Sequence, residues 1–202
     1  TPEKTEVTLQ QTQTLQSFDL YATHASYPTS QTSATAGGRS GAWSWFVGAN
    51  LEDTFSQPLA FITSASPPAG SSGAIIAANK LGKPADVLGA GGLLHSRLGN
   101  LNGKFSYDLS PTLRATYLIG YWNNDASSRT QTYLRDADGH PTYANIAGFA
   151  ANTSRTDEAH LMQGLALKSD SAGAWNGEAI ATWYDFLDDR QRSPAGVTDG
   201  LA

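Results

Sequence analysis

The chain has 202 residues, of which 40% are hydrophobic and only 15% charged, against about 25% charged residues in a typical soluble domain. Its net charge of -5 argues against nucleic acid as a partner, and the absence of cysteine excludes disulfides, thiolate metal sites and a cysteine nucleophile. No apolar run approaches the roughly 18 residues of a transmembrane helix. Because the sequence begins at Thr1 without an initiator methionine or a signal peptide, we expect a processed product or part of a longer chain.

Apolar residues alternate with polar or small ones along much of the chain, which is the period of a strand with two different faces. In the clearest segment, Thr112–Trp122, every second residue from Leu113 to Tyr121 is apolar. The alternation and the β-branched and aromatic content predict an all-β, antiparallel fold with about seven strands. In chain order, the predicted strands are Lys4–Tyr21, Gln31–Arg39, Ala42–Asp53, Leu101–Leu109, Thr112–Trp122, His160–Lys168 and Trp175–Phe186.

The connections between these strands are of two lengths. Gly37–Gly41, Asp108–Pro111 and Ser169–Gly173 have the composition of tight turns. Gln57–Ser96 and Asp125–Glu158 are expected to be long loops, which compact soluble domains seldom carry. Short turns on one side and long loops on the other are typical of an outer-membrane β-barrel, whose short turns face the periplasm.

Aromatic residues gather beside the short turns on the apolar faces of the strands. Rings at a common height next to these turns predict an interfacial girdle, whereas in a β-sandwich they would belong to the core. The opposite faces carry Lys, Asp, Glu and Asn together with small residues, as the lumen of a barrel does. The predicted girdle residues are Trp43, Trp45, Phe105, Tyr107 and Trp175.

Two segments carry a resemblance to a known family. Tyr107–Tyr117, which reads YDLSPTLRATY, continues to Gly120–Trp122 and resembles a barrel hairpin of TonB-dependent outer-membrane receptors. Ala42–Phe46, followed by Ala49–Asp53, resembles another strand of that barrel. The resemblance covers most of Lys4–Arg192. Three further segments also resemble the family: the turn Gly38–Gly41, the opening strand with Phe18–Tyr21, and the loop-like Tyr133–Gly139.

The resemblance implies a barrel of about 22 strands with a plug domain folded inside it. It implies TonB-energised import of a scarce ligand across the outer membrane of a Gram-negative bacterium, with an iron–siderophore complex as the leading candidate and cobalamin or an oligosaccharide as others. The implied partners are outer-membrane lipid, the small-molecule ligand, and the TonB complex acting through a missing N-terminal part. The complete receptor is expected to be a monomer without enzymatic activity or a cofactor.

The sequence also departs from the family pattern. It contains no TonB box, no plug and no terminal strand that ends in an aromatic residue, and it stops in the loop-like Thr198–Ala202. Single-chain bacterial barrels have an even number of strands, so about seven strands do not close one. We therefore expect residues 1–202 to be a partial barrel domain that directly follows the plug.

Catalytic and metal motifs are weak in this sequence. The four histidines lack metal-ligand spacing, and Asp136–Gly139 is predicted to be a turn rather than a calcium loop, since Ala147 stands where a twelfth-position Glu is needed. Asp185, Asp188 and Asp189 lie beside arginines and are interpreted as a solvated charge cluster rather than glycosidase carboxylates. No metal or catalytic residue is predicted.

Ligand contacts are expected in the loops and the upper lumen, where aromatic and basic side chains suit an anionic or aromatic chelate. Two alternatives remain open. One is a soluble, secreted β-sandwich that binds carbohydrate on the five tryptophans, Trp183 among them, and the other is a surface adhesin module. The candidate ligand-binding residues are Trp122, Asn123, Tyr133, Arg135 and Tyr143.

Overall fold

The computed structural model describes residues 4–79, 81–171, 173 and 176–193, and these form a single antiparallel sheet of nine strands. The all-β prediction is therefore confirmed. Within these residues the structure has no helix long and apolar enough to cross a membrane.

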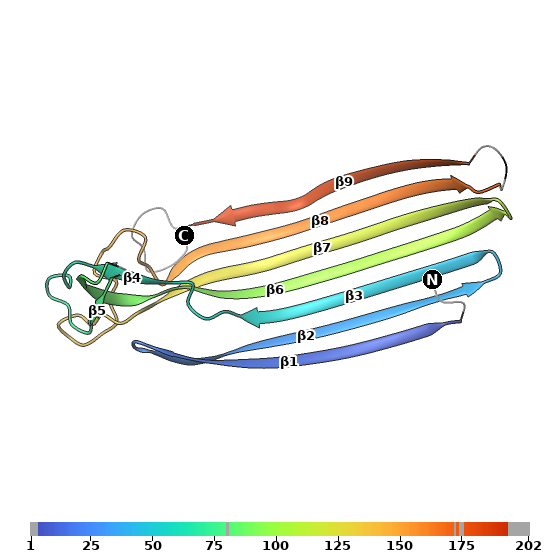
Figure 1. Ribbon diagram of the computed structural model, residues 1–202. Coiled ribbons are helices and arrows are strands. Elements are labelled where there is room, and N and C mark those ends of the chain that lie inside the picture. The colour runs from blue at the N-terminus through green and yellow to red at the C-terminus, as the bar shows by residue number, and fades with distance from the viewer. Residues whose placement is uncertain (1–3, 80, 172, 174–175, 194–202) are drawn as a thin grey trace.

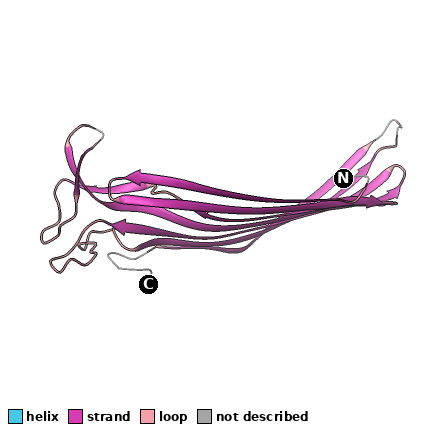
Figure 2. Cartoon of the chain, turned by 90° about the horizontal axis from the view of Figure 1, so that it is seen from below, coloured by secondary structure: helices cyan, strands magenta, loops and turns pink. Residues whose placement is uncertain are grey.

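Seven long strands follow one another across the sheet, each beside its predecessor among the long strands (Figure 1). Two short strands, β4 (Ala60–Ser64) and β5 (Ile75–Ala78), pair with the far end of β6. Figure 2 shows the long strands nearly edge-on, as one thin layer. The long strands are β1 (Glu6–Leu20), β2 (Thr23–Ser40), β3 (Trp43–Phe55), β6 (Pro84–Ser110), β7 (Leu113–Thr132), β8 (Asn152–Ser169) and β9 (Gly177–Arg192).

The two ends of the sheet differ in their connections. The tight turns after β2 and β6 and the link between β8 and β9 lie at one end, which we call the turn end. The loops 56–83 and 133–151 lie at the other, the loop end. The prediction was incomplete in one respect, because the β1–β2 hairpin also turns tightly at the loop end. Its Tyr21 adopts φ +55°, a left-handed conformation, and its ring packs on Phe61 with centroids 4.8 Å apart.

The predicted strands were too short at the loop end. Leu101–Leu109 is only the last third of β6, which has 27 residues, and β7 continues ten residues beyond Trp122 to Thr132. The predicted loops Gln57–Ser96 and Asp125–Glu158 shrink accordingly. The apolar alternation stops at this level because the upper strands carry charged residues on the same face, while the backbone ladder continues regardless of side-chain type.

The buried core lies at the loop end rather than between two layers. Tight packing there depends on glycine, since a Cβ at Gly89 would lie 2.4 Å from the Gln131 carbonyl oxygen. One cluster contains Val87, Ala90 and Tyr133, with Tyr21, Phe61 and Ile75 packed against it; the other contains Leu88, Leu134 and Phe149, with Ile62, Tyr143 and Ile146 packed against it.

Candidate functional site

The strand register places most of the apolar residues of β3, β6, β7 and β8, and part of those of β9, on the same face. Directly paired residues of an antiparallel ladder share a face, and Trp43 pairs with Tyr107, which pairs with Ala115. The resulting apolar band spans Tyr107 to Gly99 on β6, about 27 Å along the strand. It consists of Trp43, Trp45, Val47, Ala49, Leu51, Gly99, Leu101, Gly103, Phe105, Tyr107, Ala115, Tyr117, Ile119, Tyr121, Ala159, Leu161, Gln163, Leu165, Leu167, Ala179, Ala181 and Trp183.

The aromatic residues of the band lie nearest the turn end. Trp43 packs on Tyr107 with ring centroids 4.6 Å apart, and Trp45 pairs with Phe105 in the next row. Trp43 is 58% exposed, so more than half of its surface has no cover from the described part of the chain. Four of the five predicted girdle residues therefore lie side by side, and the fifth, Trp175, lies outside the described residues.

A row of charged residues crosses the same face directly beyond the band. Asp53, Arg97, Asp125, Asp157 and Arg190 are successive partners from β3 to β9, and we call them the charged row. Arg97 Nε donates to Asp53 Oδ2 at 3.2 Å. In the next row, Arg155 bridges Asp125 and Asp157 at 3.2 and 3.4 Å. On β3, β6 and β8 the face thus changes from apolar to charged within two residues, and on β9 the change comes earlier, since Asp185 pairs with Leu161.

The reverse face of the sheet is mainly polar on β6, whereas on β7 to β9 it also carries Leu118, Met162 and Ile180. Asn50, Asn100, Asn102 and Lys104 lie on it opposite the band, as the register requires. Near the turn end, Asp108 forms ion pairs with both Arg39 and Arg114 on this face. On β6 these residues are the polar ones that the sequence predicted opposite the apolar face.

Higher on the reverse face, Trp122 belongs to a cluster of aromatic and hydrogen-bonding side chains. Its ring lies 5.0 Å from that of His160, which hydrogen-bonds through Nδ1 to Tyr184 Oη at 2.7 Å. Next to them, Asn124 Nδ2 donates to Glu158 Oε2 at 2.9 Å. The predicted candidate Trp122 thus belongs to a group whose other members the sequence analysis missed, although the strand alternation places them on one face.

A pocket of about 400 Å³ lies at the loop end, between the strands and the loop 133–151. This volume is within the range of small-molecule sites, which are mainly apolar with a few polar groups. Tyr143, which lines the pocket, donates through Oη to the Thr130 carbonyl oxygen at 3.0 Å. The side chains that give the pocket its chemistry are Tyr27, Phe55, Leu93, Leu94, Arg129, Tyr143 and Asn152.

The five predicted ligand-binding residues do not form one site. Trp122 and Asn123 are adjacent in β7 and therefore face opposite sides of the sheet. Tyr133 is buried, with its hydroxyl 2.5 Å from Thr23 Oγ1, and burial raises the pKa of its phenol. Arg135 forms a backbone bridge with Ser72. Of the five residues, only Tyr143 lines the loop-end pocket.

The segment Asp136–Gly139 forms the predicted turn. Asp136 Oδ1 accepts hydrogen bonds from the backbone N–H groups of Asp138 at 3.0 Å and His140 at 2.8 Å, and Gly139 has φ +82°. These bonds explain why Asp136, Asp138 and His140 lie close together. Asp188 pairs with Arg190 on the outer part of β9, in line with a solvated charge cluster.

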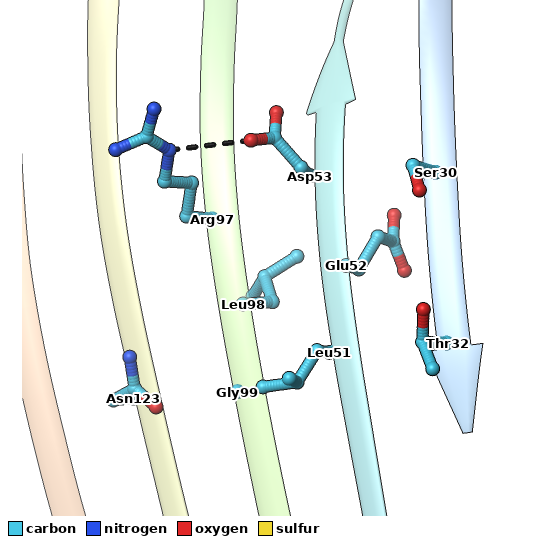
Figure 3. Close-up of a pocket in the computed structure, with 9 residues that line it drawn as sticks. All are labelled: Ser30, Thr32, Leu51, Glu52, Asp53, Arg97, Leu98, Gly99 and Asn123. Atoms are coloured by element: carbon cyan, nitrogen blue, oxygen red, sulfur yellow. Dashed lines mark hydrogen bonds and ion pairs between the residues drawn. The ribbon is translucent and has the colours of Figure 1, made fainter.

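A smaller hollow of about 280 Å³ lies where the apolar band meets the charged row (Figure 3). Leu51 and Gly99 lie at its lower side, and Asp53 and Arg97 at its upper side. Comparisons with protein-family models, curated proteins and solved structures give no match to this chain. The fold class is thus an all-β antiparallel sheet with two chemically different faces, and functional inference rests on those faces.

Proposed function

We propose that this chain is part of the β-barrel of a TonB-dependent outer-membrane receptor, which imports a scarce ligand such as an iron–siderophore complex. The observation that carries the proposal is the apolar band on one face, bordered by aromatic residues at the turn end and by the charged row toward the loop end. A membrane barrel has an outward apolar band about 25 Å tall with aromatic girdles and a polar interior. The reverse face fits that interior.

The strand lengths support membrane crossing with an extension beyond it. A transmembrane strand needs about 9–11 residues, and the long strands here have 13 to 27. The described sheet ends at β1 and β9, and edges with unpaired backbone groups are not tolerated in lipid. We therefore infer that further strands complete a larger barrel around this sheet.

The β-sandwich alternative has less support. The long strands contact their ladder neighbours, and among the described residues no second sheet packs on either face. Trp43, Trp45 and Trp183 lie on the apolar face, whereas Trp122 lies on the reverse face, so they form no common platform for a sugar.

The loop-end pocket is the proposed ligand site. Aromatic rings from Tyr27, Phe55 and Tyr143 provide stacking surfaces, and the exposed Arg129 offers a positive charge to an anionic chelate. A ligand held there would be taken up from the loop side, while TonB would supply energy from the turn side.

Cysteine labelling tests the membrane topology, because the chain has no cysteine of its own. We expect a membrane-impermeant maleimide to label Asp138→Cys on intact cells and to label Thr112→Cys only after the outer membrane is permeabilised. Both residues are exposed, one in a loop and one in a tight turn, so each is the control for the other. Equal labelling of both in intact cells would contradict the proposal.

Uptake tests the transport function. A strain lacking the gene should lose growth on one ferric siderophore supplied as sole iron source, and the full gene should restore it. Growth on cobalamin or an oligosaccharide, tested in parallel, assigns the ligand class. Unchanged uptake of every compound would refute the transport proposal.

A further inference from the structure

The hollow at the top of the apolar band combines an apolar side with an arginine that is paired to a carboxylate through Nε alone. Leu51, at the lower side of the hollow, is 64% exposed. The side chain of Arg97, at the upper side of the hollow, is 67% exposed. The hollow shares no lining residue with the loop-end pocket, which lies beyond the charged row. The hollow therefore requires a separate explanation.

Asp53 holds the Arg97 side chain in place through Nε alone and leaves its two terminal nitrogens available to a ligand. One carboxylate oxygen of Asp53 accepts from Arg97 Nε at 3.2 Å, and the other lies 2.8 Å from His95 Nε2. Both oxygens are therefore engaged. The two terminal nitrogens of Arg97 have no acceptor among the residues that the structure describes, and a guanidinium edge of this kind suits a phosphate.

Neutral polar side chains complete the hollow on the face of the apolar band, while Glu52, which also lines it, occupies the alternate position of β3 between Leu51 and Asp53. A Cβ at Gly99 would lie 2.2 Å from Asn123 Oδ1, so the glycine allows the Asn123 amide to lie across the neighbouring strand. On the other side, the Ser30 hydroxyl accepts from Gln13 Nε2 at 2.8 Å and retains its own proton for donation. Arg97, Asn123 and Ser30 thus offer donors to a phosphate and to adjacent sugar hydroxyls.

We propose that this hollow binds the phosphorylated sugar headgroup of a membrane lipid whose acyl chains lie along the apolar band. The inference rests on the proposed function, which places the band in the outer membrane and the hollow at its outer surface. Charge complementarity with Arg97 selects a phosphate, and continuity with the band through Leu51 selects a lipid over a soluble anion. A lipid A type of molecule has this chemistry.

The test uses the full-length receptor extracted from outer membranes in mild detergent. Native mass spectrometry with bisphosphorylated lipid A should give an apparent Kd about tenfold higher for Arg97→Gln than for the native protein. Dephosphorylated lipid A should bind both proteins weakly and equally. Arg155→Gln is the matched control, because Arg155 lies one row higher on the same face and its guanidinium already serves two carboxylates.

Each other result has a definite meaning. If the native protein does not fractionate with the outer membrane, both the proposed function and this site are overturned. If it does so and Arg97→Gln binds bisphosphorylated lipid A like the native protein, only the lipid site is overturned. Equal Arg97-dependent binding of phosphatidylglycerol, or full competition by millimolar inorganic phosphate, would overturn the assignment to a sugar-headed lipid.

Discussion

Ile119 lies in the middle row of the apolar band, between Gly103 and Gln163 of the neighbouring strands. An arginine on the lipid face of a membrane barrel costs about 2–4 kcal/mol near the bilayer midplane. We therefore expect Ile119→Arg to lower the free energy of unfolding by that amount, measured by urea titration in lipid vesicles. Leu118→Arg, one residue away on the polar face, should cost distinctly less. Equal costs would indicate that the two faces meet the same environment.

Thr23 and Tyr133 join the β1–β2 hairpin to the loop end through a buried hydrogen bond. Thr23 is 1% exposed and Tyr133 6%, and their hydroxyl oxygens are 2.5 Å apart. Removing one partner leaves the other unsatisfied, which costs about 1–3 kcal/mol. We expect Thr23→Val to lower the unfolding free energy by this amount and the double variant with Tyr133→Phe to recover part of the loss. Strictly additive losses would show that the two hydroxyls are not coupled.

At the scale of single residues, the sequence predicted facing better than it predicted the ligand site. Trp43, Trp45, Phe105 and Tyr107 could be assigned to one surface because period two is a direct consequence of strand geometry. Trp122 and Asn123 were grouped by residue type, although the same period separates adjacent residues. The contact between Tyr133 and Thr23 spans 110 positions and has no local signal.

At the scale of elements, the segment 65–74 between β4 and β5 makes a close backbone contact at Gly73. Gly73 has φ +90°, and a Cβ there would lie 2.4 Å from the Tyr133 carbonyl oxygen, beside the bridge between Ser72 and Arg135. We expect Gly73→Ala to loosen the segment between β4 and β5, whose ends stay paired with β6, and to speed its cleavage in limited proteolysis. Gly70→Ala is the control, since Gly70 has φ +74° but a Cβ added there would meet no atom within 4 Å. Equal cleavage rates would mean that backbone strain alone accounts for the effect.

The extent of β6 and β7 could not be predicted from apolar alternation. Beyond Gly99 and Tyr121, the face that carries the band continues with Arg97 and Asp125, which pair directly across the ladder. Residues 123–132 of β7 are polar on both faces and have the composition of a loop, whereas Val87–Leu94 of β6 are apolar or glycine on both faces, so neither segment alternates. Apolar alternation therefore predicted only the part of each strand whose two faces differ in polarity.

At the scale of the whole molecule, the described sheet exposes large apolar side chains that a soluble monomer would bury. Leu51, Leu165 and Trp183 are among them, and β1 and β9 present unpaired edges. Exposed edges and apolar patches promote association. We expect the 202-residue chain to aggregate in detergent-free buffer and to disperse in detergent, as measured by light scattering. A monodisperse, cooperatively unfolding chain in plain buffer would contradict the membrane proposal.

The strand length beyond the charged row has an evolutionary consequence. From Arg97 back to Pro84, β6 continues for about 40 Å of strand past the apolar band. Because side chains alternate between the two faces, deleting one residue from such a stretch moves every side chain on one side of the deletion to the opposite face of the sheet. Deleting two residues leaves each side chain on its original face. We infer that the distance between the loops and the apolar band changes among relatives in paired steps, made in both strands of a hairpin together. The loops then vary in height while the rows of the apolar band keep their alignment.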